Sequence, residues 1–219
     1  MADMTTADDG PHRGLPVSAA GEPLDAARAA LILLHGRGAS AADILSFAPA
    51  LAQPGLAMLA PQAAGNAWYP NSFLAPIASN EPYLSGALAT VDSLVERALA
   101  AGIPLERVAL LGFSQGACLA LEYAARHARR YGGLIGWTGG LIGPDDAPRD
   151  YPGRFESAPV FLGSSDQDPY VPQARIALTA ETLRGMGADV TLRIYPDTAH
   201  TVNDDEIAFA RGLLAALVT

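Results

Sequence analysis

Cysteine is nearly absent from this sequence, because its 219 residues include only Cys118. A single cysteine excludes an intrachain disulfide framework and any metal site built from several cysteines. Positive charge is also scarce: 14 Lys and Arg residues stand against 23 Asp and Glu residues, a formal net charge of −9. Nucleic acid and anionic membrane surfaces attract basic proteins, so this balance argues against both as partners.

Long apolar runs are missing as well. No run approaches the roughly 20 residues that a helix needs to span a bilayer. The first nine residues lack the basic stretch and apolar segment of a signal peptide. We therefore expect a cytoplasmic protein without stable membrane association, as a monomer or homodimer. The length predicts a single domain over residues 1–219, with residues 1–11 flexible.

Apolar runs alternate with amphipathic stretches along most of the chain. Continuous apolar runs predict buried strands, and a spacing of three or four residues predicts helices. The predicted strands are 29–34, 57–60, 108–112, 134–137, 159–163 and 190–195, and the predicted helices are 40–51, 88–99, 115–128, 173–184 and 203–217. This alternation predicts an α/β fold with an open, mostly parallel sheet and helices on both faces.

The two ends of the predicted sheet have weaker patterns. Residues 14–21 form a short extended segment, which we expect to be a hairpin arm leading to strand 29–34. Strand 190–195 alternates apolar and polar residues. Alternation is typical of a strand that is less buried, so we expect this one near the edge of the sheet.

Two stretches, 62–85 and 138–157, lack helical or strand periodicity and contain several Pro and Gly residues. A loop of this length inside a compact domain is commonly a lid or the wall of a binding site. For residues 62–85 the alternative is a loop whose aromatic side chains only hold it to the core. The predicted pocket walls are Trp68, Tyr69, Phe73, Leu141 and Ile142.

Three predicted strand ends carry reactive groups, and ligands of parallel sheets bind at these ends. Residues 112–116 read Gly-Phe-Ser-Gln-Gly, which predicts a sharp turn from strand to helix with Ser114 at its tip. An acidic loop follows strand 159–163, and His200 follows strand 190–195. The order serine, aspartate, histidine is that of α/β-hydrolase triads, in which the imidazole activates the serine and the carboxylate orients the imidazole.

His200 is the predicted general base because it alone of the four histidines completes this order. His12 lies in the N-terminal arm, which we expect to be mobile, and His127 lies on a helix away from the strand ends. His35 does follow a strand. We expect it to be structural and bonded to the loop backbone.

The carboxylate that orients His200 has three candidates. Asp166 and Asp168 follow the same strand, and Asp197 lies three residues before His200. Asp168 precedes a proline and the next helix, so its backbone is more constrained. Asp166 and Asp197 are expected to stabilise their own turns, although the residues alone leave the choice open.

An oxyanion hole is predicted from two main-chain N–H groups. One belongs to Gln115, directly after the nucleophile, and the other to Arg37 in the glycine-rich turn at 35–38. The Arg37 side chain has two open directions, the pocket rim and solvent. Cys118 lies one helical turn behind Ser114 and is expected to be a buried, inert thiol.

These motifs carry a resemblance to a known family. Residues 34–38 (Leu-His-Gly-Arg-Gly), 112–116 and 168–172 (Asp-Pro-Tyr-Val-Pro), together with His200, resemble the phospholipase/carboxylesterase family of α/β-hydrolases. That family includes bacterial carboxylesterases and acyl-protein thioesterases. The resemblance extends from about residue 31 to the last helix. It implies the α/β-hydrolase fold, with Ser114, Asp168 and His200 as triad and Arg37 and Gln115 as backbone donors.

The activity implied by the resemblance is hydrolysis of small carboxylic esters or thioesters through an acyl-enzyme, without a metal or organic cofactor. The alternatives are a lysophospholipase, a lactone hydrolase of the dienelactone type, and a non-catalytic binding module. Dienelactone hydrolases usually have cysteine where this chain has Ser114, and degenerate modules normally lose a triad residue. Arg37 and Ala117 depart from the acyl-protein thioesterase pattern, which usually has Leu and commonly Gly there. Arg37 together with residues 68–70 (Trp-Tyr-Pro) resembles the bacterial esterase branch more closely, which argues against depalmitoylation of proteins as the activity.

Overall fold

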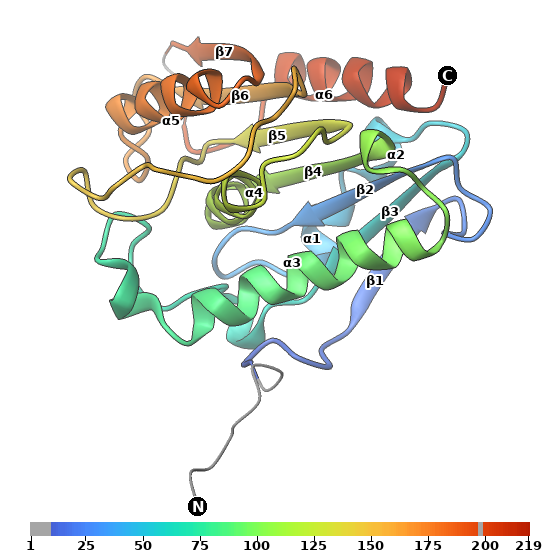
Figure 1. Ribbon diagram of the computed structural model, residues 1–219, viewed down its shortest axis with the longest axis horizontal. Helices are drawn as coiled ribbons and strands as arrows, with labels where there is room; N and C mark the ends of the chain where they lie inside the picture. Colours follow the sequence, from blue (N-terminus) through green and yellow to red (C-terminus); the bar gives the residue numbers. More distant parts are fainter. Residues whose placement is uncertain (1–9, 197–198) are drawn as a thin grey trace, which may run out of the picture.

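The computed structural model describes residues 10–196 and 199–219, which form a seven-stranded sheet with helices on both faces (Figure 1). The strands are β1 (Val17–Gly21), β2 (Ala29–Leu34), β3 (Leu56–Pro61), β4 (Val108–Phe113), β5 (Gly133–Trp137), β6 (Pro159–Ser165) and β7 (Asp189–Tyr195). Their order across the sheet is β1-β3-β2-β4-β5-β6-β7. β1 is antiparallel to β3, and the other neighbouring pairs are parallel. The predicted α/β fold, with its open and mostly parallel sheet, is confirmed.

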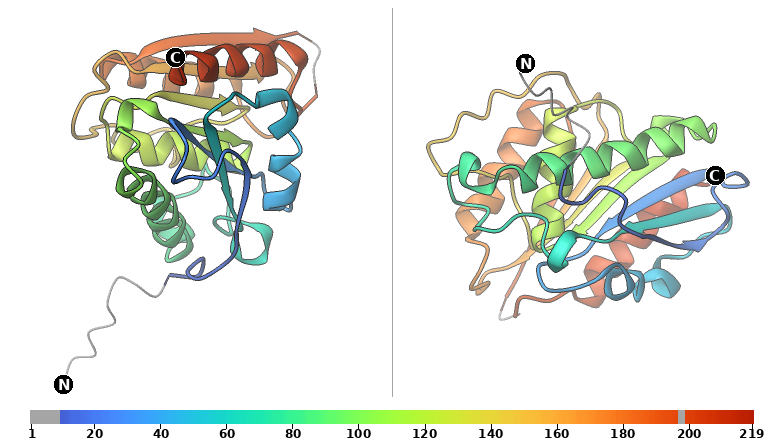
Figure 2. Two further views of the ribbon diagram at one scale, coloured as in Figure 1. Left: turned by 90° about the vertical axis from the view of Figure 1, so that its right-hand side faces the viewer. Right: turned by 90° about the horizontal axis from the view of Figure 1, so that it is seen from below.

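The helices form two layers, one on each side of the sheet (Figure 2). One layer contains α3 (Tyr83–Ala100), α4 (Gln115–Arg126) and α5 (Gln173–Gly185), and the other contains α1 (Ala41–Leu45), α2 (Ala48–Leu51) and α6 (Asp204–Leu217). Short 3-10 helices occur at η1 (Ala64–Asn66), η2 (Ile77–Asn80) and η3 (Leu105–Arg107). Because both faces are covered, every residue of β2 and β3 is buried, which explains their continuous apolar runs. Within the described ranges, no helix combines the length and apolarity needed to cross a membrane.

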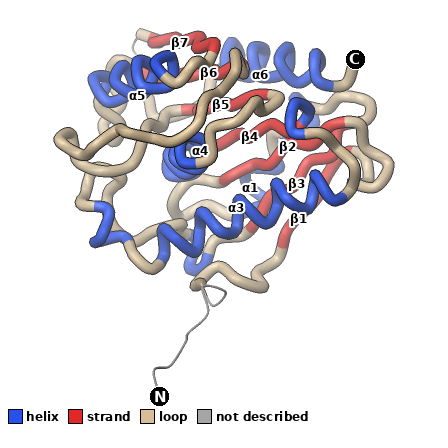
Figure 3. The backbone as a smooth tube through the Cα atoms, viewed as in Figure 1, coloured by secondary structure: helices blue, strands red, loops and turns tan. Residues whose placement is uncertain are grey.

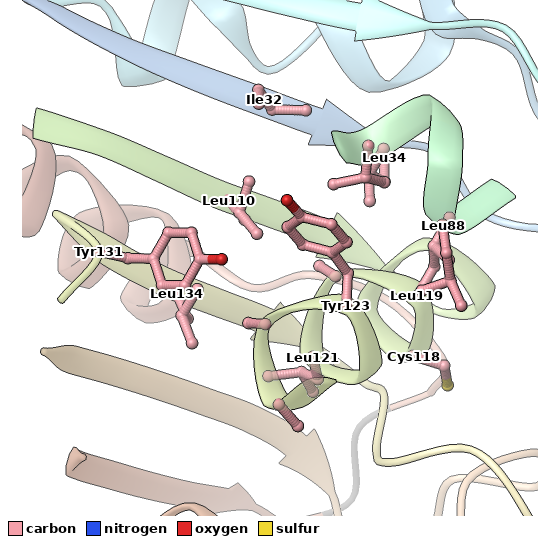
Figure 4. Close-up of a cluster of buried hydrophobic side chains, with 14 of the residues drawn as sticks. Ile32, Leu34, Leu88, Leu110, Cys118, Leu119, Leu121, Tyr123, Tyr131 and Leu134 are labelled. Carbon is pink, nitrogen blue, oxygen red and sulfur yellow. The ribbon is translucent and has the colours of Figure 1, made fainter. Parts of the chain in front are cut away.

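The position of α4 is fixed by the apolar core between the sheet and helices α3 to α5. Figure 4 shows Leu119 and Leu121 of α4 in the same cluster as Ile32 of β2 and Leu110 of β4. All four side chains are fully buried. Full burial of one such side chain stabilises the fold by roughly 1.5–3 kcal/mol. Because these contacts fix α4 against the sheet, they also fix the turn at which α4 begins.

Three local predictions are wrong. β1 pairs with β3, so the N-terminal segment is not a hairpin arm beside β2. The single helix predicted over 40–51 is divided into α1 and α2, because Pro49 has no N–H with which to continue the first helix. α3 begins at Tyr83, five residues before the predicted start, so the preceding loop is shorter than expected. The edge position of β7 is confirmed.

The N-terminal arm is also better ordered around His12 than its polar sequence predicts. His12 is 2 % exposed, its Nε2 donates to the main-chain oxygen of Trp68 at 2.9 Å, and its Nδ1 accepts from the N–H of Ala64 at 3.0 Å. The expected mobility of this histidine is therefore wrong. The predicted flexibility of residues 1–11 falls mostly on residues 1–9, which lie outside the described residues.

Candidate active site

Ser114 occupies the turn between β4 and α4. Its φ of 55° and ψ of −119° belong to a region that residues other than glycine rarely adopt. A Cβ on Gly112 would lie 2.2 Å from the oxygen of Gly116, and one on Gly116 would lie 2.1 Å from the oxygen of Leu34. Both positions therefore require glycine, and the tight turn presents the serine at the carboxyl end of its strand.

His200 connects Ser114 to an acidic side chain. It lies between β7 and α6, with Nε2 2.8 Å from Oγ of Ser114 and Nδ1 2.7 Å from Oδ2 of Asp168. With the Nδ1 proton donated to the carboxylate, Nε2 is left as the acceptor for the serine hydroxyl. The imidazole also contacts the rings of Phe113 and Tyr170, at centroid distances of 5.1 and 5.0 Å.

Asp168 is well prepared to orient this imidazole. Its side chain is fully buried, and Oδ1 accepts hydrogen bonds from the main-chain N–H groups of Tyr170 at 2.8 Å and Val171 at 3.0 Å. Those two donors fix the carboxylate and leave Oδ2 for His200. Of the other two candidates, Asp166 is exposed and Asp197 lies outside the described residues.

The two predicted oxyanion donors adjoin the serine. Gln115 is the first residue of α4, so its main-chain N–H has no acceptor within the helix and lies at the positive end of the helix dipole. A Cβ on Gly36 would lie 3.4 Å from Cβ of Ser114, which places the turn containing Arg37 directly beside the serine. The main-chain N–H of Arg37 forms no hydrogen bond with the described residues.

A cavity of about 540 Å³ opens over Ser114 and His200. Two of the five predicted wall residues, Tyr69 and Phe73, line it. The loop patterns did not predict the rest of the lining. Besides the triad residues Ser114 and His200, it consists of Arg37, Pro70, Asn71, Ser72, Gln115, Cys118, Tyr170 and Val171. Tyr170 follows Asp168 in the same loop, so the position of its ring could have been inferred from that motif.

The other three predicted wall residues lie elsewhere. Trp68, Leu141 and Ile142 are fully buried and are not among the residues that line the cavity. The indole N–H of Trp68 donates to the oxygen of His35 at 2.8 Å, and Leu141 and Ile142 belong to the core. A large apolar side chain in a loop indicates that the side chain is buried. It does not indicate whether the side chain is buried in the core or in the wall of a pocket. For Trp68 this burial and hydrogen bond agree with the alternative, in which an aromatic side chain holds the first loop to the core.

Two polar side chains join the first long loop to the turns at the carboxyl ends of β2 and β4. The amide of Gln115 accepts from the N–H of Trp68 and donates to the oxygen of Tyr69, both at 2.8 Å. His35 accepts from the N–H of Ala63 at 3.1 Å through Nε2. The predicted structural role of His35, bonded to the loop backbone, is confirmed, whereas the role of the Gln115 side chain was not predicted.

Cys118 lies at the cavity but remains a neutral thiol. It is 1 % exposed, and burial raises its pKa to about 12. Because the thiolate is the reactive form, this thiol is inert at neutral pH.

The parallel sheet, the strained serine turn and the hydrogen-bonded serine, histidine and aspartate are together those of an α/β-hydrolase. The sequence pattern of the family described as Phospholipase/Carboxylesterase matches residues 17–218, and the chain belongs to that family.

Individual relatives agree with this assignment. The chain is 44 % identical to a phospholipase/carboxylesterase from Dyadobacter fermentans, whose crystal structure superposes with a TM-score of 0.88 over 92 % of this chain and 96 % of that one. It is 32 % identical over 124 residues to acyl-protein thioesterase 1 of Gibberella zeae, a match covering 52 % of this chain and 50 % of the relative. A putative carboxymethylenebutenolidase of Salmonella typhi is 29 % identical over 130 residues, 55 % of this chain and 46 % of that protein. The match thus spans about half the length of these two curated relatives.

Proposed function

We propose that this chain is a serine carboxylesterase that hydrolyses small carboxylic esters through an acyl-enzyme. The observation that carries the proposal is the pair of hydrogen bonds at His200, 2.8 Å to the Ser114 hydroxyl and 2.7 Å to the Asp168 carboxylate. A serine bonded to an imidazole that a carboxylate orients is the arrangement that activates a weak nucleophile. Membership of the phospholipase/carboxylesterase family supports the same chemistry.

Each group has a defined step. Oγ of Ser114 attacks the ester carbonyl carbon while its proton moves to Nε2 of His200. The N–H groups of Arg37 and Gln115 stabilise the negative oxygen of the tetrahedral intermediate. His200 then transfers the proton to the departing alcohol, and the acyl group remains on Ser114. Water, deprotonated by His200, attacks this acyl-enzyme, the acid is released and Ser114 regains its proton.

The cavity supports a small substrate. Its volume of about 540 Å³ lies within the range of roughly 300–1,000 Å³ that small-molecule sites occupy. Tyr69 and Phe73 provide apolar area beside the serine. A thioester would follow the same steps with a thiol as leaving group. A panel of short esters, acyl thioesters, lysophospholipid and an enol-lactone ranks these classes, and the proposal requires the short esters to be turned over.

The decisive experiment replaces Ser114 by Ala. We expect turnover of p-nitrophenyl acetate and butyrate to fall by about 10⁴-fold or more, because the nucleophile is lost. A fluorophosphonate probe should label the wild-type protein once and leave S114A unlabelled. The matched control is Ser93→Ala, because Ser93 is an exposed residue of α3 whose hydroxyl donates to the oxygen of Thr90 in the same helix. Circular dichroism checks the fold, and unchanged turnover in folded S114A would overturn the proposal.

A further inference from the structure

The cavity contains a cation that the proposed reaction does not use. Among the described residues that line it, Arg37 has the only permanently charged side chain, and no carboxylate is present. The reaction as proposed needs only the main-chain N–H of this residue. Its guanidinium, whose direction the sequence left open, therefore requires a separate explanation.

The guanidinium is fixed against the cavity wall by neutral groups. Nη1 donates to the main-chain oxygen of Pro70 at 2.8 Å, and Nη2 donates to that of Asn71 at 2.6 Å. Both acceptors belong to residues that line the same cavity. Two such bonds hold the side chain in place before any ligand arrives, so little conformational freedom remains to be lost on binding.

The charge of Arg37 is not neutralised. No carboxylate of the described residues forms an ion pair with it, whereas Arg126, Arg175 and Arg193 pair with Glu122, Asp145 and Asp205 respectively. Carbonyl oxygens satisfy hydrogen-bond donors without removing the positive charge. In a chain with a net charge of −9, the cavity thus retains a cation that attracts negatively charged ligands.

A second donor lies on the same wall. The hydroxyl of Ser72 accepts a hydrogen bond from the N–H of Leu74 at 3.2 Å and donates to no acceptor among the described residues. Its proton is therefore available to a ligand. A guanidinium and a hydroxyl that line the same cavity are suited to a carboxylate, which accepts several hydrogen bonds at once.

We propose that Arg37 makes the site selective for esters that carry a carboxylate on their acyl or alcohol part. The turn containing Arg37 adjoins Ser114, so one small molecule can place its carboxylate on the guanidinium and its ester carbonyl on the serine. This inference rests on the proposed esterase activity and names its substrate class. The guanidinium acts on the charge of the substrate and not on the reacting atoms.

The test compares substrates that differ only in charge. Monoethyl esters of the four-, five- and six-carbon dicarboxylic acids are each paired with the corresponding ester amide, which has the same shape and no charge. Acetylglycolate and acetylglycolamide form the equivalent pair on the alcohol side. In at least one pair we expect kcat/KM of the wild-type protein to be about tenfold higher for the anion at low salt. A hydrogen bond to a charged group is more favourable than one to a neutral group, and the difference in free energy corresponds to about a tenfold ratio. The preference should shrink in 0.5 M salt.

Variants then assign the preference to the side chain. Arg37→Gln should reduce the anion-to-amide ratio to about one, and Arg37→Lys should keep part of it, because the charge remains without the planar fork. The ratio is taken within each variant, so an effect on the main-chain N–H cancels. Arg130→Gln removes the same charge from an exposed residue distant from the cavity lining, and should leave the ratio unchanged.

Two results would overturn the inference while leaving the esterase proposal intact. One is a wild-type ratio near one for every pair. The other is a loss in Arg37→Gln that is equal for anion and amide, which would mean that the guanidinium only supports the loop at Pro70 and Asn71. Failure of the esterase proposal itself looks different: neither member of any pair is hydrolysed, and the fluorophosphonate probe does not label Ser114.

Discussion

Two long loops meet beside the cavity, and different kinds of group hold them. The first loop, residues 62–82, joins β3 to α3, and the second, residues 138–158, joins β5 to β6 (Figure 3). They contact each other where the N–H of Gly143 donates to the oxygen of Phe73 at 2.7 Å. The first loop lines the cavity, and none of the cavity lining among the described residues comes from the second.

Besides the Arg37 guanidinium and the imidazoles of His12 and His35, two neutral amides hold the first loop. The side chain of Asn80, which is fully buried, accepts from the N–H of Asn71 at 2.8 Å and donates to the oxygen of Ser72 at 3.1 Å. Gln115 makes the equivalent pair of bonds to Trp68 and Tyr69. An amide supplies one donor and one acceptor to the backbone without a buried charge, so these contacts have no dependence on pH.

Buried charges hold the second loop. Glu122 is 1 % exposed and accepts from the N–H of Ile142, the hydroxyl of Tyr151 and Nε of Arg126. Arg175 is 2 % exposed and donates to the oxygens of Leu141 and Gly143 and to the Asp145 carboxylate. Burial of a charge is costly unless several hydrogen bonds compensate for the lost hydration. Glu122 and Arg175 each form three such bonds. The second loop adds no described residue to the cavity lining and is joined to the first by the bond from Gly143 to Phe73, so we expect stability and substrate binding to respond to different substitutions.

The largest expected effect on stability is that of Glu122→Ala. The substitution leaves the N–H of Ile142 and the hydroxyl of Tyr151 without their acceptor in a buried setting, and we expect the free energy of unfolding to fall by about 4 kcal/mol. Urea denaturation measures this loss. kcat/KM per folded molecule should change little, because neither residue lines the cavity. Glu96→Ala, at an exposed site on α3, should stay within about 0.5 kcal/mol of the wild type. A loss of activity larger than the loss of folded protein would contradict the separation of the two loops.

The elements that position the site could be predicted from the sequence because their signals are local. The apolar run of β4 and the glycine spacing around Ser114 each occupy a few adjacent residues, and both predict the strand and the turn. Pro49 was an equally local signal for the break between α1 and α2, and the 40–51 prediction overlooked it. The choice of Asp168 came from the resemblance to a family, since three acidic residues were compatible with the strand order.

The walls of the cavity could not be predicted because their positions depend on the path of the loops. Leu141 and Phe73 are both large apolar residues in irregular segments and both belong to the core, yet only Phe73 also lines the cavity. The Arg37 guanidinium bonds to the main-chain oxygens of Pro70 and Asn71, about 33 residues away, and no pattern of side chains encodes such a partner. The role of a buried polar residue such as Glu122 is equally hard to predict, because an acidic residue in a helix ordinarily faces solvent.

The loop that carries His200 leads into α6, which contains a further buried ionisable side chain. This carboxyl has fewer hydrogen-bond donors than Glu122. Glu206 of α6 is 1 % exposed, and its Oε2 accepts from the N–H of Asn203, but Oε1 has no hydrogen-bond partner among the described residues. Burial raises the pKa of Glu206 to about 7, with a smaller contribution from the charge of Asp205. The folded state therefore binds this proton more tightly than the unfolded state, whose glutamate titrates at about 4.3. The stability associated with Glu206 is fully present below that value and is lost as the pH rises through about 7.

Glu206→Gln tests this dependence and keeps an oxygen for the Asn203 N–H. The difference in unfolding free energy, variant minus wild type, should become more favourable by about 2 kcal/mol between pH 5 and pH 8, because the variant never holds a buried carboxylate. Urea denaturation at both pH values measures it. Glu181→Gln, at an exposed position of α5, should show the same difference at both. A difference for Glu206→Gln that does not change with pH would show that its single donor compensates the charge as fully as the three donors of Glu122 do.

Gln115→Ala is expected to have the smallest effect on stability. In contrast to Glu122→Ala, it should reduce activity more than it reduces the free energy of unfolding. It removes the bonds to Trp68 and Tyr69, but Gln115 lines the cavity, so water can replace part of what is lost and the free energy of unfolding should fall by only about 1 kcal/mol. Activity should suffer more. Because the wall at Tyr69 is no longer fixed relative to the serine turn, kcat/KM for p-nitrophenyl butyrate should fall by about tenfold. Gln173→Ala, at an exposed amide at the start of α5, should alter neither quantity. If Gln115→Ala instead lost several kcal/mol while keeping its kcat/KM, the neutral anchor would be a support like Glu122, and the distinction between the two loops would disappear.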